Sequence, residues 1–243
     1  MRIVLTFVPL LVLSSCVKIP PNFHKCNRKS PDFQTCMFES AKKGVLELVR
    51  PYPELTIPSF DPFELTEMTI GGTDGPVYFQ QKFTKCKFYG LVDLDIDNFE
   101  FNFEKKVVRM SGMFPEIQMV CDYEVKVKIL VLNIHGIGNS TVILKNLKIT
   151  DVLPFEETKR MGRTFPNFKS SSVTIDPELV VFNFENHKNK ALSDSVNPIL
   201  NNNWKDIFDE VKGEYAQVID RIVLNVVNSF FNKVTFEEAF DST

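Results

Sequence analysis

The sequence lacks the residue patterns that would support catalysis. Its three histidines, His24, His135 and His187, are scattered, without the paired spacing of a helical zinc site. A Gly-x-Ser-x-Gly nucleophile turn and a Gly-Lys-Thr phosphate loop are both absent. Gly136-x-Gly138 has no third glycine, and we interpret it as a turn and not as a dinucleotide loop. We therefore predict a protein that is not an enzyme and that uses no cofactor and no metal.

An excess of basic residues is also missing. The chain has 28 Lys and Arg against 31 Asp and Glu, for a formal charge of −3, which gives no sign of a nucleic-acid partner or of an anionic membrane. Asp93, Asp95 and Asp97 alternate and so share one face of a strand. Because no further ligands accompany them, we interpret them as part of a solvated sheet face and not as a calcium site.

Only the first residues form an uninterrupted apolar run. Residues 1–16 contain an early charge at Arg2, an apolar stretch Ile3–Leu13 and then small residues, which predicts a secretory signal peptide. The mature protein would be residues 17–243, one domain located outside the cell. Leu13-Ser-Ser-Cys16 also fits a bacterial lipoprotein box, which is the alternative. No later stretch approaches ~18 apolar residues, so we expect no stable membrane insertion.

Export determines how the cysteines are interpreted. Four of the five remain after the predicted cleavage, and an even number in an oxidising compartment favours disulfides. Cys26 and Cys36 would close a short loop that otherwise frays. Cys86 and Cys121 are in phase with apolar neighbours in strand-like segments. We favour two buried thiols there, with a second bridge as the alternative.

Apolar residues recur at steps of three and four from Leu200 to Val234, which predicts one long helix of about nine turns, roughly 50 Å at ~1.5 Å per residue. Nine of the fourteen residues from Val218 to Phe231 are large and apolar, so that half must be surrounded. A short N-terminal helix is predicted to begin at Ser30-Pro31 and end before Pro51. Four prolines between residues 51 and 62 predict an extended linker.

Apolar residues alternate with polar ones through most of Val77–Phe184, which is typical of antiparallel strands with one buried face. The phase slips at Asp97-Asn98 and again between Leu144 and Leu147, and we expect bulges that bend the strands. The predicted fold class is α+β, a highly curved antiparallel sheet (a super-roll) wrapped around the long C-terminal helix.

Two segments interrupt the strand pattern. Gly136-Ile-Gly138 predicts a tight corner, and Asn139-Ser-Thr141 next to it is a glycosylation sequon, compatible with secretion. Residues 151–169 are charged and irregular, and we expect a loop at one end of the sheet.

Several short motifs together resemble takeout-like proteins, the insect relatives of juvenile-hormone-binding protein. In chain order they are the Cys26/Cys36 pair, Pro58-x-x-Asp61-Pro62, Phe88-Tyr-Gly-Leu91, Gly136-x-Gly138, Asn202-Asn-Trp204 and Phe230-Phe-Asn-Lys-Val234. The resemblance implies a curved sheet around a long helix, an apolar tunnel for a terpenoid or other lipid, and a Cys26–Cys36 disulfide. No cysteine follows Cys121, unlike in the haemolymph hormone carriers, which favours the broader takeout group over a carrier of juvenile hormone itself.

We therefore predict a secreted carrier of a small hydrophobic ligand such as a terpenoid or a fatty acid. The alternative is a secreted structural or receptor-interacting protein with a filled core, and its receptor would be unknown. Inward strand positions and the apolar half of the helix are the candidate ligand contacts, with the Tyr123 hydroxyl as a polar anchor: Phe88, Phe101, Met110, Phe114, Met119, Tyr123, Val127, Phe182, Ile219, Ile222, Val226 and Phe230.

Overall fold

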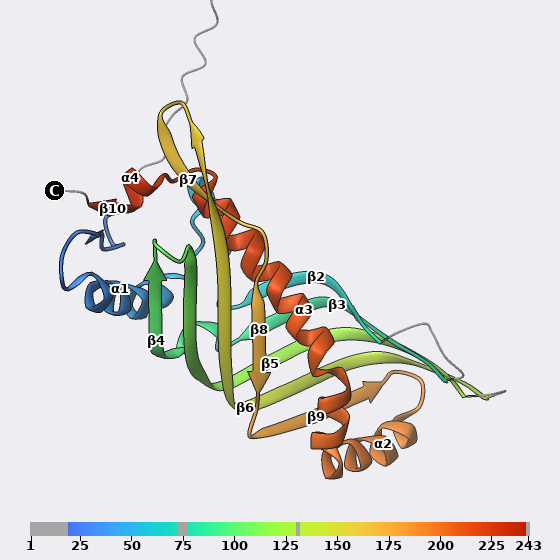
Figure 1. Ribbon diagram of the computed structural model, residues 1–243. Helices are drawn as coiled ribbons and strands as arrows, with labels where there is room; N and C mark the ends of the chain where they lie inside the picture. Colours follow the sequence, from blue (N-terminus) through green and yellow to red (C-terminus); the bar gives the residue numbers. More distant parts are fainter. Residues whose placement is uncertain (1–18, 72–76, 130–131, 242–243) are drawn as a thin grey trace, which may run out of the picture.

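Two long strands, β5 (Val107–Ile129) and β6 (Leu132–Arg160), form the centre of the fold in the computed structural model (Figure 1). They pair antiparallel along their length, from Val107 opposite Pro154 to Ile129 opposite Leu132. The structure describes residues 19–71, 77–129 and 132–241, with side chains described outside 77–79, 127–129 and 132–134. The predicted signal peptide lies outside the described residues.

Shorter strands attach to both sides of this ribbon and make an eight-stranded antiparallel sheet. On one side β5 pairs first with β4 and then with β3, which pairs with β2, and on the other side β6 pairs in turn with β9, β8 and β7. The strands are β2 (Phe63–Ile70), β3 (Val77–Tyr89), β4 (Asp95–Asn102), β7 (Arg163–Phe168), β8 (Ser172–Asp176) and β9 (Leu179–Asn186).

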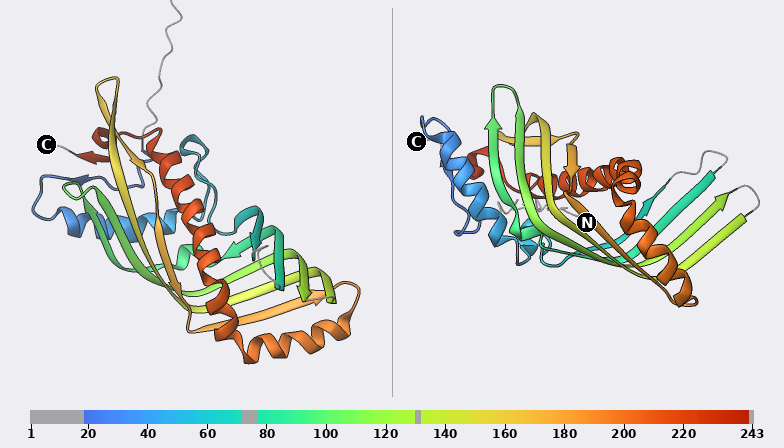
Figure 2. Two further views of the ribbon diagram at one scale, coloured as in Figure 1. Left: turned by 45° about the vertical axis from the view of Figure 1, so that its right-hand side comes forward. Right: turned by 90° about the horizontal axis from the view of Figure 1, so that it is seen from below.

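Of the two predicted bulges, the first is confirmed, whereas the β5–β6 register continues without a shift through the second phase slip. The register of β4 against β5 shifts between Ile96 and Asn98. In the β5–β6 ladder Pro115 and Asn146 face each other without pairing; proline has no N–H to donate, and Asn146 has φ of 47°. The resulting half-barrel has a concave face, which Figure 2 shows with the C-terminal helix running along it.

In the described residues four α-helices accompany the sheet: α1 (Phe33–Glu47), α2 (Lys190–Asn202), α3 (Trp204–Phe231) and the short α4 (Phe236–Ala239). The predicted α+β class and the N-terminal helix are confirmed. The prediction of one helix from Leu200 was wrong, because the chain breaks at Asn203 and α2 precedes the break. Asparagine has a low helix propensity, and three stand in a row at 201–203. Leu200 and Trp204 are four residues apart across the break, so the helical spacing of apolar residues continues through it and the sequence pattern did not indicate a break.

The helix α2 covers the outer edge of β9 with carboxamide side chains. Asn201 accepts a hydrogen bond from the Phe182 N–H at 2.8 Å and donates one to the Phe182 carbonyl at 2.9 Å. One turn earlier, Asn197 does the same for Phe184, at 2.9 and 3.1 Å. Each amide thus replaces one residue of a missing neighbouring strand.

Carboxamide side chains bond the backbone in the same way at the edges of two other strands, β4 and β7. Gln34 of α1 bonds both the N–H and the carbonyl of Phe101 in β4, at 3.3 and 3.0 Å. Asn228 of α3 bonds both groups of Phe168 in β7, at 3.0 and 2.9 Å. These contacts fix α1 and α3 against opposite edges of the sheet.

Three further local predictions were wrong. Gly136 and Gly138 lie inside β6 and form no corner; a Cβ on Gly138 would lie 1.7 Å from the Glu185 carbonyl oxygen, so glycine allows β9 to approach. Residues 151–169 form the β6–β7 hairpin, whose turn at Met161-Gly162 has two positive φ angles. The proline segment holds the short helix η1 (Pro53–Leu55), with Leu55 fully buried, and not an extended linker.

Two disulfides are present. Cys26–Cys36 joins α1 to the short strand β1 (Cys26–Asn27), as expected. Cys86–Cys121 corrects the expectation of two buried thiols. Between the pairs Thr84–Asp122 and Lys87–Val120 a bulge sets two residues of β3 against Cys121 alone, and the Cα atoms of Cys86 and Cys121 lie 4.2 Å apart. Periodicity showed that both cysteines face inward but not that their strands pair in this register.

No helix in the described part of the chain is long and apolar enough to cross a membrane.

The disulfide pattern can be tested by digesting the unreduced protein and mapping its peptides by mass. We expect linked peptides containing Cys86 with Cys121 and Cys26 with Cys36, and an intact mass that rises by four hydrogens on reduction. Recovery of Cys86 and Cys121 as alkylated single peptides, with trapping agent present from lysis onward, would contradict the second bridge.

The edge contacts predict that Asn228→Ala lowers the free energy of unfolding by about 2–3 kcal/mol, because both backbone groups of Phe168 lose their partner. Denaturant unfolding measures the loss, and faster hydrogen exchange at the Phe168 amide locates it. Asn225→Ala is the matched control, since Asn225 is exposed on the same helix and its loss should change stability by less than about 0.5 kcal/mol. Equal effects of the two variants would refute the edge role.

Candidate ligand cavity

A cavity of about 450 Å³ is lined by residues of α1, α3 and the concave face of the sheet. It lies at the end of the molecule where α1 runs beside β4, an arrangement that Figure 1 shows. This volume falls in the usual range for small-molecule sites. Its wall is almost entirely apolar and is contributed by the following residues: Ile19, Phe23, His24, Lys25, Cys26, Met37, Ser40, Ala41, Gly44, Val45, Leu48, Phe60, Ile96, Phe99, Phe101, Val108, Met110, Asp151, Leu153, Phe168, Ile222, Val223, Val226, Val227, Phe230, Phe231, Ala239 and Phe240.

The helix α1 supplies one side of the cavity through a stripe at four-residue spacing, Met37, Ala41 and Val45. Three attachments hold the helix there. Gln34 bonds the backbone of β4, Cys36 is bridged to β1, and β1 pairs in parallel with β10 (Phe240–Asp241). The stripe therefore faces the sheet at a distance set by contacts in the first turn of the helix.

The opposite wall is the apolar half of α3. Ile222, Val226 and Phe230 follow one another at four-residue steps, and each lines the cavity. Within α3 only Phe208 and Phe231 are buried, so the prediction that this half is fully surrounded was too strong. Part of its apolar surface faces the cavity and not another side chain.

Aromatic rings close the cavity beside α4. The ring of Phe101 lies 5.1 Å from that of Phe240 and 6.0 Å from that of Phe236, both in edge-to-face geometry. Phe155 and Phe168 join the same cluster. This packing accounts for part of the abundance of phenylalanine and gives the cavity a rigid end.

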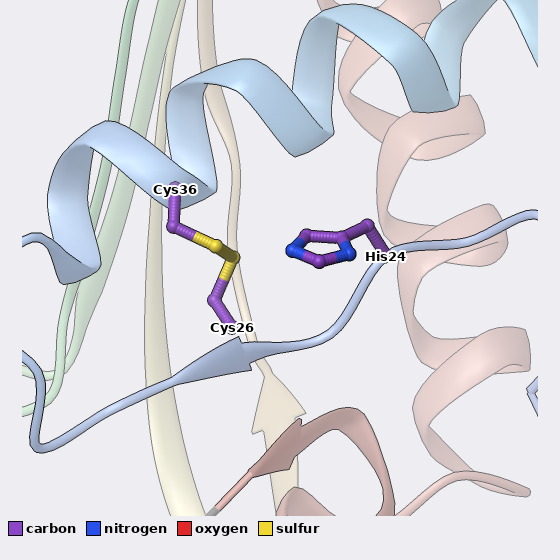
Figure 3. A group of neighbouring side chains, drawn as sticks. All are labelled: His24, Cys26 and Cys36. Atoms are coloured by element: carbon purple, nitrogen blue, oxygen red, sulfur yellow. A yellow bond between two sulfur atoms is a disulfide. The ribbon is translucent and has the colours of Figure 1, made fainter.

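Few polar side chains reach the wall. His24 and Lys25 are exposed, Ser40 is half-buried, and Asp151 is buried. Figure 3 shows the His24 imidazole facing the Cys26–Cys36 disulfide. These three are the only group among the described residues whose ligand atoms are close enough to hold a metal ion, and both sulfurs are already bonded to each other. The group therefore offers no thiolate to a metal.

The structure brings five of the twelve predicted ligand contacts together in this cavity: Phe101, Met110, Ile222, Val226 and Phe230. Six others pack in or against the larger core cluster and do not line the cavity: Phe88, Phe114, Met119, Tyr123, Phe182 and Ile219. Val127 lies in β5, but its side chain is outside the described part. For these seven residues, contact with a ligand stays a prediction.

Tyr123 was expected to offer a hydroxyl to the ligand. Burial raises its pKa, while a hydrogen bond with the Asn186 side chain acts in the opposite direction. Its ring packs edge-on against Phe184, with centroids 5.1 Å apart. Tyr123 does not line the cavity, so its predicted role as the polar anchor stays a prediction.

Sequence reasoning missed most of the wall, including the stripe on α1 and Asp151. The stripe on α1 was visible as periodicity, but nothing in it indicated which surface it would face. Asp151 lies between Ile149 and Leu153 in the alternating pattern of β6, and both of these neighbours are buried. A single carboxylate at a position where the pattern requires an apolar residue was therefore the sequence signal for this part of the wall.

Comparison with known proteins gives concordant matches. A model of the haemolymph juvenile hormone binding protein family matches residues 3–241. The circadian clock-controlled protein daywake of Drosophila melanogaster is 23% identical over 218 residues, 86% of this chain and 84% of that protein. Its Drosophila yakuba counterpart is 21% identical, over 85% and 84%. The crystal structure of Takeout 1 from Epiphyas postvittana is 25% identical with a TM-score of 0.75, covering 89% of this chain and 99% of that one.

Proposed function

This chain belongs to the haemolymph juvenile hormone binding protein family, and we propose that it is a secreted carrier that binds one small hydrophobic ligand in the cavity between α1, α3 and the sheet. The observation that carries the proposal is the apolar wall of that cavity. Phe101, Met110, Ile222, Val226 and Phe230 are proposed to contact the ligand.

Burial of apolar surface supplies enough energy for such a carrier. A lipid that buries about 300–400 Å² of its surface would gain roughly 7–10 kcal/mol at ~25 cal/mol per Å². The loss of translational freedom on binding subtracts part of this, which leaves room for an affinity near the micromolar range.

The cavity favours the carrier over a protein with a filled core, since a filled core would leave no space between α1 and α3. Export is supported by the two disulfides and by the haemolymph location in the family's name. The signal peptide at residues 1–16 and glycosylation at Asn139, which is exposed, stay predictions.

The proposal predicts that Val226→Trp abolishes binding of an apolar fluorescent probe while the protein remains folded, because the indole would occupy the space of the ligand. Fluorescence titration measures binding, and thermal unfolding followed by circular dichroism measures folding. Asn225→Trp introduces the same side chain one position away on the exposed face and should leave binding unchanged. Unchanged binding in Val226→Trp, or equal losses in the two variants, would contradict the cavity as the site.

Native mass spectrometry of the secreted protein, followed by organic extraction, tests the carrier function directly. We expect one bound lipid per chain, released on denaturation. A protein without bound lipid that also fails to take up apolar probes would refute the proposal and favour the filled-core alternative.

A further inference from the structure

One charged side chain interrupts the apolar wall of the cavity. Asp151 lies in β6 opposite Met110 of β5 on one side and Val173 of β8 on the other. Its neighbours in the same phase, Ile149 and Leu153, are buried, as is Asp151 itself at 1% exposure. A carboxyl at such a position loses its hydration and must find partners within the protein or its ligand.

The two oxygens of this carboxyl differ in their surroundings. Oδ1 lies 2.9 Å from the hydroxyl oxygen of Ser171. The same hydroxyl lies 2.9 Å from Oδ1 of Asp220 in α3, which also accepts the Val173 N–H at 2.9 Å. Oδ2 of Asp151 has no hydrogen-bond partner among the described residues.

The number of protons in this group determines what Oδ2 can do. The Ser171 hydroxyl carries one proton and can donate to only one of the two carboxyls. Both short contacts are hydrogen bonds only if a carboxyl supplies a second proton. Oδ1 of Asp220 already accepts the Val173 N–H, whereas Oδ2 of Asp151 accepts no hydrogen bond from a described residue. We therefore infer that the second proton lies on Asp151 and is shared between its Oδ1 and the Ser171 hydroxyl oxygen. Oδ2 is then a carbonyl-type oxygen with free lone pairs.

Electrostatics supports the neutral state. Burial is the largest influence and raises the pKa of Asp151, and the nearby charge of Asp220 also raises it; the contacts with Ser171 and with the backbone of Ser172 and Val152 lower it, but the net direction is upward. Asp151 therefore resembles an amide in its hydrogen bonding, with a donor directed at Ser171 and an acceptor left over.

We propose that Oδ2 of Asp151 accepts a hydrogen bond from a hydroxyl group of the ligand, so that the cavity selects a lipid alcohol over an ether, an ester or a hydrocarbon of the same shape. The inference rests on the proposed carrier function and adds the ligand class to it. A hydroxyl is the smallest lipid group that can donate to an uncharged acceptor, and the remaining wall requires the rest of the molecule to be apolar.

Two substitutions at Asp151 distinguish the effect of the hydrogen-bond acceptor on binding from the effect of the side chain's shape. Asp151→Val removes the acceptor but leaves Ser171 bonded to Asp220, so the fold should tolerate it. Asp151→Asn keeps the arrangement of the neutral acid, with the amide N–H₂ donating to Ser171 and the amide oxygen in place of Oδ2. Dodecanol, its methyl ether and dodecane serve as probes of equal chain length, titrated against each protein by competition with an apolar fluorescent dye.

We expect Asp151→Val to weaken dodecanol binding about tenfold and to leave the methyl ether and dodecane within about twofold, the effect of one lost hydrogen bond. Asp151→Asn should bind dodecanol as the wild type does. Because each comparison is made for one compound between two proteins, differences in water solubility cancel.

Each other outcome overturns the inference in a distinct way. Equal losses for dodecanol and its ether, or no loss for dodecanol, would remove the acceptor role while leaving the carrier function intact. Loss of dodecanol binding in Asp151→Asn would refute the neutral carboxyl. If the wild type binds none of the three compounds, the carrier function and this inference are overturned together.

A measurement on the wild-type protein covers the case in which Asp151→Val does not fold. Infrared difference spectra should show the C=O band of a buried neutral carboxyl shifting to lower frequency when dodecanol binds and not when dodecane binds, and Asp151→Asn should lack this band. A band that does not respond to dodecanol, or no such band, would contradict the proposal.

Discussion

A sheet that curls without closing keeps two open edges, and the backbone groups along those edges must find partners. In this molecule helix side chains provide them. Asn197 and Asn201 serve β9, Asn228 serves β7 and Gln34 serves β4, and each amide bonds both the N–H and the carbonyl of one residue. A carboxamide suits this task because it carries a donor and an acceptor in the spacing of a peptide group. The positions of the helices are therefore set largely by the sheet edges.

The cavity is a consequence of this arrangement. Helices that pack only through apolar faces approach until their side chains interdigitate. Here α1 and the second half of α3 are attached to opposite edges of the sheet, at β4 and β7, so their apolar stripes face each other across a gap. The phenylalanine cluster beside α4 closes one end of that gap. An apolar helix and an unfilled space are thus compatible in one stable fold.

Patterns in the sequence predicted the structural features that are determined by residues close together in the chain. The alternation in β5 and the phase slips at Asn98 and Asn146 were predicted from the sequence, and the family motifs added the overall architecture. The start of α1 was placed at Ser30-Pro31, whereas the helix begins at Phe33 without a side-chain cap. What failed depends on pairing between distant segments. Cys86 and Cys121 meet only because of a bulge in the β3–β5 register, and α2, which ends before the break at Asn203, docks on the distant strand β9. For the site, five of the twelve residues named from the apolar pattern line the cavity. The pattern reports which residues turn inward but not where the interior is left empty, so it missed the α1 stripe and Asp151.

The parallel pairing of β1 with β10 affects the order in which the parts of the molecule can fold. Cys26 and Phe240, which pair there, are separated by most of the chain, and both line the cavity. Closing a loop of that length costs more entropy than forming the β5–β6 hairpin, whose strands are adjacent in sequence. The hairpin and its neighbouring strands are therefore expected to form early, and the cavity end to form late in folding. The wall that Cys26 and Phe240 contribute to the cavity is therefore completed only after the half-barrel behind it has formed.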